Sequence, residues 1–336
     1  AWCLEKLNPV RKALRQGRLA AGPLASFILA NLLAEKPLLV DPVNASRTLL
    51  WGYRSRDWSD ELLRLFRIPD GILPQCVPNQ HSFGHLRLDN WEIPLTVVTG
   101  DQAAALFAGG KLDNDSVYVN LGTGAFIQRL YGKIPPQVPG MLGSVLWQKD
   151  DQVLYVLEGT VNGAGSALTW LCGRLDMSEK EMLAGMPAAL AADSSAPLFL
   201  NGISGLGSPY WVPTFRSRFI GRGTSIQKML ATVESIVFLL NVNLDRMCGA
   251  GTPPSSIVIS GGLSQWDSLV QWLADLSGLP VQRPALQETT ASGLAWLLGM
   301  RARTAISADV FKPNKNALLE NRYRRWCAAM QDALSR

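Results

Sequence analysis

Histidine and closely spaced cysteine are nearly absent from this 336-residue chain. The two histidines, His81 and His85, stand four residues apart, a spacing that could bind a metal on a helix. Turn-forming neighbours favour a loop there instead, namely Pro78, Ser82 and Gly84. The five cysteines are far apart and form no CxxC pair, which argues against a zinc site or a disulfide framework. The sequence therefore predicts a reducing compartment, the cytoplasm.

Common catalytic and nucleotide-binding patterns are missing as well. With both histidines in one short stretch, a Ser-His-Asp arrangement is not expected, and the GxSxG motif of a nucleophile elbow does not occur. The segment Gly205 to Ser208 lacks the glycine that would have to follow the serine. Neither the dinucleotide motif GxGxxG nor the P-loop GxxxxGK[ST] is found, so both of those readings are rejected.

Charged residues make up only 18% of the chain, while hydrophobic residues make up 47%. This balance excludes a disordered chain and allows a sizeable core. The net charge is +5, but the basic residues are mostly scattered. We expect the two densest basic groups to be solvated helix faces rather than a nucleic-acid patch; they are Arg11, Lys12, Arg15 and Arg18, and Arg322, Arg324 and Arg325.

Long apolar runs are rare too. The longest uncharged run, from Leu19 to Ala34, contains a glycine, a proline and an asparagine and is too short to span a bilayer comfortably. No signal peptide is visible. The expected partner is therefore a small molecule, with neither nucleic acid nor a membrane involved.

Predicted strands alternate with predicted helices and glycine corners, which is typical of an α/β fold. We expect a loop at 41–47, a polar connection at 77–92, and a helix cap at Ser225. The strands are expected at 38–40, 93–98, 116–121, 125–130, 145–147, 153–157, 198–200 and 257–260. The helices are expected at 2–16, 24–33, 60–66, 166–171, 226–247, 264–276, 291–302 and 321–334.

One corner of this pattern carries a carboxylate. The apolar run 93–98 is typical of a buried strand, Gly100 then turns the chain, and Asp101 opens a run of good helix formers. Ligands bind at such strand-to-helix edges in α/β folds. A residue that only caps its helix would produce the same pattern.

Two glycine corners also follow predicted strands. Gly122-Thr123-Gly124 joins two strands as a hairpin turn would, and glycines with a threonine hydroxyl can also approach phosphate oxygens. Gly261-Gly262 stands between a strand and a helix, where the helix N-terminus favours anions and glycine admits a flat ring or a ribose. Phosphoryl transfer needs an anion-binding backbone, a divalent ion and a base near the acceptor hydroxyl. Asp101 could be that base.

Several short motifs, taken together and in order, resemble the FGGY carbohydrate kinases, with the glycerol kinase branch the most similar. They are GDQ at 100–102, GTGAF at 122–126, LEG at 157–159, GLGSPYW at 205–211 and SGGLSQ at 260–265. NASRT at 44–48, DWSDE at 57–61 and ETTASG at 288–293 are also similar. Each motif is weak alone, but the ordered set covers nearly the whole chain and is specific.

The resemblance implies an actin/hexokinase-like (ribonuclease H-like) ATPase fold, in which two α/β domains close over a cleft. Residues 1–107 would be the remainder of the substrate-side N-terminal domain, and residues 108–336 the nucleotide-side C-terminal domain. The implied reaction is ATP-dependent phosphorylation of a polyol or sugar hydroxyl, with glycerol first and a ketose or pentitol second. Mg²⁺ is the implied metal, and a homodimer is compatible with the resemblance.

The resemblance also implies roles for individual residues. Asp101 would be the catalytic base and a contact of the metal, while Gln102 and Phe126 would touch the polyol. The nucleotide would meet the glycine corners: the first beside the phosphates, Gly163 near the phosphates or ribose, and the second facing the adenosine. The nucleotide-side set is Gly122, Thr123, Gly124, Gly163, Gly261, Gly262 and Gln265.

This chain departs from the family pattern in three places. The family's first phosphate loop, its metal-linked aspartate and part of its sugar site would precede Ala1. Trp266 stands where the family has an asparagine near the adenine. Val212 and Ser217 replace an aspartate and a glycine in the segment after Pro-Tyr-Trp.

These departures motivate an alternative, a non-catalytic relative that binds nucleotide or a partner protein without transferring phosphate. The kinase is favoured because a non-catalytic remnant would have no chemical need to combine four residues suited to phosphoryl transfer. These residues are Asp101, Gln102, Thr123 and Phe126.

Overall fold

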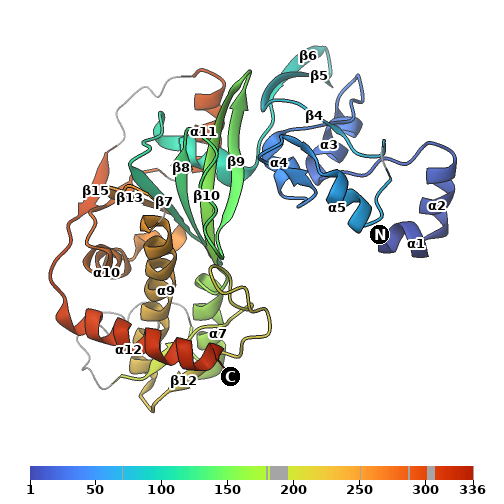
Figure 1. Cartoon of the computed structure of the whole chain (residues 1–336). Helices are drawn as coiled ribbons and strands as arrows, with labels where there is room; N and C mark the ends of the chain where they lie inside the picture. The colour runs from blue at the N-terminus through green and yellow to red at the C-terminus, as the bar shows by residue number, and fades with distance from the viewer. Residues whose placement is uncertain are drawn as a thin grey trace.

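A mixed seven-stranded sheet carries most of the chain in the computed structural model, which describes residues 1–69, 71–178, 181, 196–249, 251–286, 288–300 and 307–335 (Figure 1). The strand order is β15-β14-β13-β7-β8-β10-β9. β7, β13 and β14 run parallel to one another, and the other neighbours are antiparallel. The strands are β7 (Ser116–Leu121), β8 (Ala125–Tyr131), β9 (Leu142–Lys149), β10 (Gln152–Val161), β13 (Ser256–Ser260), β14 (Val281–Pro284) and β15 (Ala308–Phe311).

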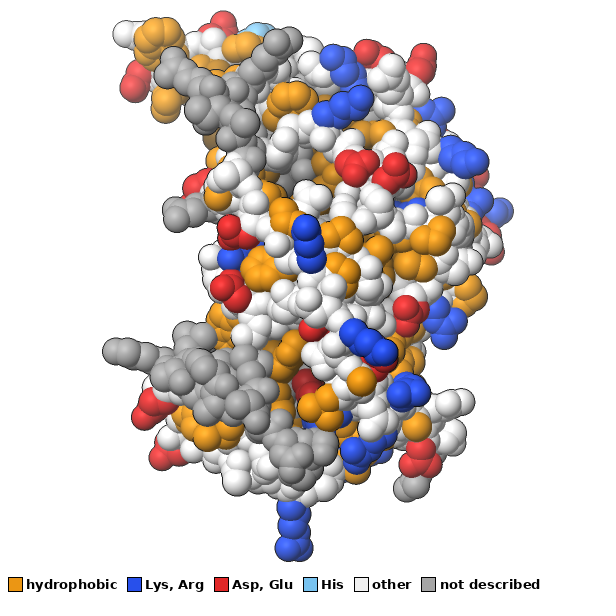
Figure 2. Space-filling view, turned by 90° about the vertical axis from the view of Figure 1, so that its left-hand side faces the viewer, with side chains coloured by type: hydrophobic (Ala, Val, Ile, Leu, Met, Phe, Trp, Pro, Cys, Tyr) orange, Lys and Arg blue, Asp and Glu red, His pale blue; other side chains and the backbone are white. Residues whose placement is uncertain are grey.

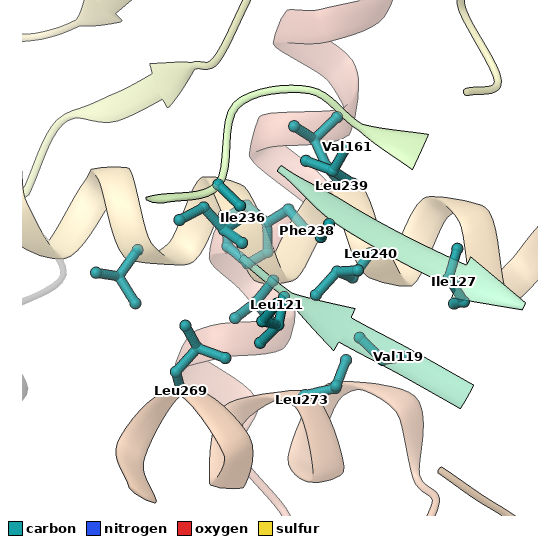
Figure 3. Close-up of a cluster of buried hydrophobic side chains, with 14 of the residues drawn as sticks. Val119, Leu121, Ile127, Val161, Ile236, Phe238, Leu239, Leu240, Leu269 and Leu273 are labelled. Carbon is teal, nitrogen blue, oxygen red and sulfur yellow. The ribbon is translucent and has the colours of Figure 1, made fainter. Parts of the chain in front are cut away.

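One face of this sheet is the main hydrophobic core. Successive residues of a strand point to opposite faces, so Val119 and Leu121 of β7 and Ile127 of β8 enter the core together. Figure 3 shows these side chains meeting those of two helices. The helices of this layer are α7 (Gly165–Leu175), α9 (Ser225–Cys248), α10 (Asp267–Ser277) and α12 (Ala317–Leu334).

The central helix α9 is long and apolar enough to cross a membrane by length and composition alone, but 72% of its most apolar window is buried in the protein. Thr224 begins it with a reciprocal capping box, because its hydroxyl accepts from the Gln227 N–H while the Gln227 side chain accepts from the Thr224 N–H. The predicted cap at Ser225 is therefore wrong by one residue. The burial is that of a core helix.

The other face of the sheet is covered only in part. α6 (Asp101–Leu106) and the 3₁₀ turn η1 (Phe107–Gly109) pack there, with Phe107 edge-on against Trp147 of β9 at 5.9 Å between ring centroids. α11 (Thr289–Leu297) lies directly against α6 and η1. The part of this face over β7, β13 and β14 is left open as a cavity.

The first hundred residues lie beyond β9, to one side of the sheet (Figure 1). They are joined to it by a small apolar cluster that includes Val40, Ala45 and Trp51 on one side and Val145 and Tyr155 on the other. The elements of this part are α1 (Trp2–Lys6), α2 (Asn8–Arg15), α3 (Leu24–Leu32), β1 (Leu39–Val40), α4 (Pro42–Ser46), β2 (Trp51–Gly52), β3 (Asp57–Trp58), α5 (Asp60–Leu65), β4 (Gln75–Cys76), β5 (Gln80–Leu88) and β6 (Trp91–Val97).

Three expectations for this part are wrong. Residues 77–92, expected as a polar connection around the histidines, hold β5 and the turn of a hairpin, because Leu88 pairs with Trp91 across the two-residue turn Asp89-Asn90. β6, expected as a buried strand, is the exposed partner in this hairpin, with Ile93 44% exposed. Residues 41–47, expected as a loop, contain α4, because the buried Asp41 carboxylate caps it by accepting from the Val43 and Asn44 N–H groups.

One basic residue is also misassigned. Arg322, expected on a solvated helix face, is 2% exposed in α12. Its guanidinium donates to both carboxylate oxygens of Glu234 at 2.6 and 2.5 Å and to the carbonyls of Ala196 and Pro197. Burial of this arginine is possible because a carboxylate and two carbonyls satisfy its donors.

Candidate active site

A cavity of about 870 Å³ opens on the partly covered face of the sheet, between α6, η1 and α11. It extends along β7 and β13 to their carboxyl ends, the edge at which α/β folds bind ligands. Six of the residues predicted from the sequence line it: Asp101, Gln102, Phe126, Gly261, Gly262 and Gln265.

The strand period explains which residues form the cavity floor. While their neighbours face the core, Asn120 of β7 and Ser260 of β13 face the cavity, and the Asn120 Nδ2 donates to the Ser260 Oγ at 3.1 Å. Phe126 and Gln128 of β8 also line the cavity, two residues apart on the same face of the strand. Asn120 and Gln128 were not predicted as site residues from the sequence. The period of two along a strand could have indicated Gln128, because it places Gln128 on the same face as Phe126.

Gln128 is held in place from the side by Glu158, its cross-strand neighbour on β10. Its Nε2 donates to the Glu158 carboxylate at 3.2 Å, and Glu158 is 1% exposed. Arg47 of the N-terminal part binds the same carboxylate through two guanidinium nitrogens, at 2.5 and 3.0 Å. A carboxylate can only accept hydrogen bonds, so this pairing fixes which end of the Gln128 amide is left for the cavity, its oxygen.

Asp101 is the first residue of α6 and is exposed to the cavity. The N-cap position belongs to Gly100 instead, and the Asp101 Oδ1 accepts from the Gln102 N–H at 2.7 Å. The Thr290 hydroxyl of α11 donates to the Asp101 backbone carbonyl at 3.4 Å. The carboxylate therefore lies at the N-terminus of α6, and a hydrogen bond from α11, about 190 residues later in the sequence, helps to fix the position of this helix.

Gly261, the first residue of the second glycine corner, requires glycine for two reasons. Gly261 has a φ of +93°, and a Cβ there would lie 2.4 Å from the carbonyl oxygen of Leu121 at the end of β7. This close approach places the corner beside the end of the neighbouring strand. A Cβ on Gly262 would meet nothing within 4 Å, so this residue leaves its side of the cavity open to a ligand.

The other predicted glycines lie outside the cavity lining. The carbonyls of Gly122 and Thr123 accept from the N–H groups of Gly165 and Ser166, at 3.0 and 2.9 Å, so the Gly122-Thr123-Gly124 turn is fastened to the N-terminus of α7. Gly163 is buried, and its carbonyl accepts from the Asn201 side chain at 2.7 Å. Thr123 is exposed on the turn.

Three ionisable residues at the end of the cavity near the start of β7 were not predicted: Lys111, Asp113 and Tyr118. The Asp115 N–H and the Ser116 hydroxyl donate to Asp113 and lower the pKa of its carboxyl, so it is negatively charged at neutral pH. Burial raises the pKa of the Tyr118 phenol, which stays neutral.

Asp101 and Asp113 are the carboxylates of the lining. Within the described ranges, no group of three or more His, Cys, Asp and Glu side chains could hold a metal ion by itself. His85, one of the two histidines, lies instead against Glu35, with its Nδ1 2.7 Å from the carboxylate.

Two further features bear on ligand choice. Trp266, at the end of the 3₁₀ turn η2 (Gly262–Gln265), packs against the main core and is not part of the cavity lining. Figure 2 shows one face of the molecule, on which the Lys and Arg side chains stand apart from one another rather than in a basic stripe. That face gives no support to a nucleic-acid surface.

The chain has the actin/hexokinase-like ATPase fold, which solved structures share. Glycerol kinase from Plasmodium falciparum with ADP has a TM-score of 0.83 at 20% identity, over 99% of this chain and 70% of that one. Xylulose kinase from Rhodospirillum rubrum has a TM-score of 0.80 at 18% identity, over 99% and 72%.

The sequence comparisons show the family. Residues 117–302 match the C-terminal domain of the FGGY family of carbohydrate kinases, and this chain belongs to that family. It is 34% identical to glycerol kinase of Aquifex aeolicus over 89% of this chain and 62% of that protein. It is 32% identical to glycerol kinase of Halothermothrix orenii over 99% and 71%. The chain therefore spans about two thirds of the length of these relatives, and the family and fold predicted from the sequence are confirmed.

Proposed function

We propose that this chain is the part of an ATP-dependent polyol or sugar kinase that carries the catalytic base and the adenosine side of the site. The observation behind this proposal is that Asp101, Phe126 and the Gly261-Gly262 corner, predicted from separate motifs, line one cavity in a member of a carbohydrate kinase family. Glycerol is the first acceptor to test, because several similar proteins are glycerol kinases, and a ketose or pentitol is the second.

The proposed mechanism assigns a role to each side of the cavity. The Asp101 carboxylate accepts the proton of the acceptor hydroxyl as the hydroxyl oxygen bonds to the γ-phosphorus and the bond to the bridging oxygen of ADP breaks. Gln102 and Phe126 hold the polyol beside it, the amide by hydrogen bonds and the ring by packing on carbon. Gly261, Gly262 and Gln265 would border the adenosine, and the exposed Thr123 turn would reach the phosphates.

The residues present fit a magnesium ion shared with the nucleotide. Mg²⁺ is usually held by one or two carboxylates together with substrate phosphates rather than by an all-protein cage. Asp101 is the carboxylate we assign to it, and Asp113 is the other one in the lining. When bound, the ion would neutralise charge on the phosphates.

We also propose that the boundary between the substrate-side and nucleotide-side domains lies at residues 107–108, within η1, so that the cavity lies between the two domains. A cytoplasmic location is proposed from the five cysteines, which are far apart in the sequence and form no CxxC pair. A homodimer is proposed from the exposed apolar side chains of α3, such as Phe27, which is 66% exposed. Sedimentation analysis tests it.

The decisive test is Asp101→Asn in the intact protein. We expect turnover with ATP and glycerol, or another polyol, to fall by about 10²–10⁴-fold, the usual contribution of a general base, with ADP affinity almost unchanged. Asp150→Asn is the matched control, since Asp150 lies in the exposed β9–β10 turn at a φ of +49°, which asparagine also adopts. Near-normal turnover of Asp101→Asn rejects the base role. ADP binding without transfer to any acceptor by the wild type would favour the non-catalytic relative.

A further inference from the structure

Arg283 lies directly behind the nucleotide side of the cavity. It stands in β14 between Gln282 and Pro284, which both line the cavity, but is not itself part of the lining. Its side chain is 14% exposed, and its guanidinium carbon lies 5.0 Å from the centroid of the Phe311 ring on β15. The mechanism above does not use this arginine.

The guanidinium of Arg283 joins three separate segments. Its Nη1 donates to the carbonyl oxygen of Ser264 in η2 at 2.9 Å and to the Asp267 carboxylate at the start of α10 at 2.8 Å. Its Nε and Nη2 donate to one oxygen of Asp309 on β15, at 3.2 and 2.7 Å. One side chain therefore fastens the 3₁₀ turn, the following helix and the edge strand to β14.

The turn held in this way borders the proposed adenosine site. Gly262, Ser264 and Gln265 of η2 all line the cavity. The Ser264 N–H and hydroxyl both donate to the Gly261 carbonyl, so they stabilise the turn internally, while Arg283 ties the Ser264 carbonyl to the sheet. A short 3₁₀ turn has poorer hydrogen-bond geometry than an α-helix, so an external tie has a large share in fixing its position.

Only arginine has the geometry for this arrangement. Its planar fork presents five N–H donors in fixed directions, whereas a lysine ammonium is a single point that cannot reach Ser264, Asp267 and Asp309 together. The two carboxylates are largely exposed, at 74% and 66%, so the ion pairs add little to global stability. Their effect is to orient the guanidinium toward the carbonyl of the turn.

We propose that Arg283 is a positioning residue for the nucleotide, holding η2 in the conformation that binds adenosine. This inference rests on the proposed function, because it assumes that the η2 side of the cavity takes the nucleotide. Without Arg283 the turn would have to be ordered at the moment of binding, and ordering lowers affinity. The loss concerns ATP and ADP, because the acceptor side is formed by α6 and β8.

The experiment compares Arg283→Met and Arg283→Lys with the wild-type intact protein. Methionine keeps an unbranched stem but has no donors, and lysine keeps the charge. We expect the KM for ATP and the Kd for ADP to rise about 10- to 100-fold in Arg283→Met, the effect of losing a charge-assisted hydrogen bond. Arg283→Lys and Asp309→Asn should give smaller increases. The KM for the acceptor and the kcat at saturating ATP should stay within about twofold of wild type.

Arg87→Met is the matched control. Arg87 is also a strand arginine paired with a carboxylate, that of Glu92 at 3.2 Å, but it lies on the exposed hairpin away from the cavity. We expect its kinetic constants to equal those of the wild type. Calorimetric ADP titration and thermal unfolding complete the set for each variant.

The possible outcomes separate the inference from the proposed function. A wild-type protein that neither binds ADP nor transfers phosphate rejects both. A wild type that is active, together with an Arg283→Met whose ADP affinity is unchanged, rejects the positioning role alone. A fall in the thermal midpoint and in kcat with no change in the KM for ATP also rejects it, because the arginine would then only stabilise the fold.

Discussion

The contact between α11 and α6 leads to a prediction about stability, which depends on whether a Cβ atom can be added at Gly293. A Cβ placed on Gly293 of α11 would lie 1.7 Å from the carbonyl oxygen and 2.6 Å from the carbonyl carbon of Ala104 in α6. Real Cβ atoms stay at least 3.0 Å from such atoms, so Gly293→Ala requires the two helices to separate by about 1.3 Å. Both neighbours are backbone atoms, so no flexible side chain can move aside.

Two opposing effects decide the magnitude. Alanine favours a helix over glycine by about 0.5–1 kcal/mol. Overpacking of this kind typically costs about 1–3 kcal/mol and sometimes more. The overlap with backbone atoms places Gly293→Ala at the upper end of this cost, so we expect a net loss of stability of about 2 kcal/mol or more. Gly173→Ala is the control, because Gly173 lies in the last turn of α7 with nothing within 4 Å of an added Cβ. This control should be neutral or stabilising.

The same shift should reach Asp101, the proposed catalytic base. Asp101 begins α6 three residues before Ala104, and its carbonyl accepts from Thr290 of α11. A displacement of about 1 Å at a reacting group can lower turnover about 10²-fold. We therefore expect Gly293→Ala to lose kcat while keeping ADP affinity. Denaturant unfolding and steady-state kinetics on the intact protein measure both effects. Stability and kcat like those of Gly173→Ala would refute the reasoning.

Two further predictions concern carboxylates that accept hydrogen bonds from a neighbouring side chain. The hydrogen bonds from His85 lower the pKa of Glu35 from 4.5 to about 2, so the contribution of Glu35 to stability is present above pH 4.5 and lost as the pH falls toward 2. Glu35→Gln should therefore flatten the dependence of the urea midpoint on pH between pH 4.5 and 2. An unchanged dependence would contradict this assignment. Arg322→Met leaves Glu234 buried without its partner and should reduce the free energy of unfolding by about 3–5 kcal/mol. The double variant with Glu234→Leu should recover much of that loss in thermal unfolding, and no recovery would mean that the carbonyl contacts of the arginine dominate.

Most of the central sheet could be predicted from the sequence, because its strands show the clearest patterns. The expected strand 116–121 and the structure's β7 (Ser116–Leu121) coincide, since apolar and other residues alternate along it. The Gly122-Thr123-Gly124 turn and the Gly261-Gly262 corner also stand where glycine predicted them. Local pattern and tertiary structure agree at these places.

The errors arise where a distant contact overrides the local pattern. Arg322 has the surroundings of a surface residue in the sequence, and only the fold shows that Glu234 lies beside it. Residues 80–88 looked irregular because most of them are polar, and only the fold shows that they pair with β6 and bury Phe83 in a small apolar cluster. The tie between Arg283 and Ser264 was equally hidden, because a backbone carbonyl leaves no trace in the sequence.

The position of the cavity follows from the two neighbours of β7. On one side β13 runs parallel to it, so both strands end at the same edge, and the chain turns there at Gly261 against the carbonyl of Leu121. On the other side β8 returns antiparallel and places Phe126 opposite Asn120. Motifs about 140 residues apart in sequence therefore lie one strand apart in space, and β7 alone separates the proposed adenosine side from the proposed acceptor side. A change that shifts β13 relative to β7 should move the nucleotide relative to the acceptor, because no other strand lies between them.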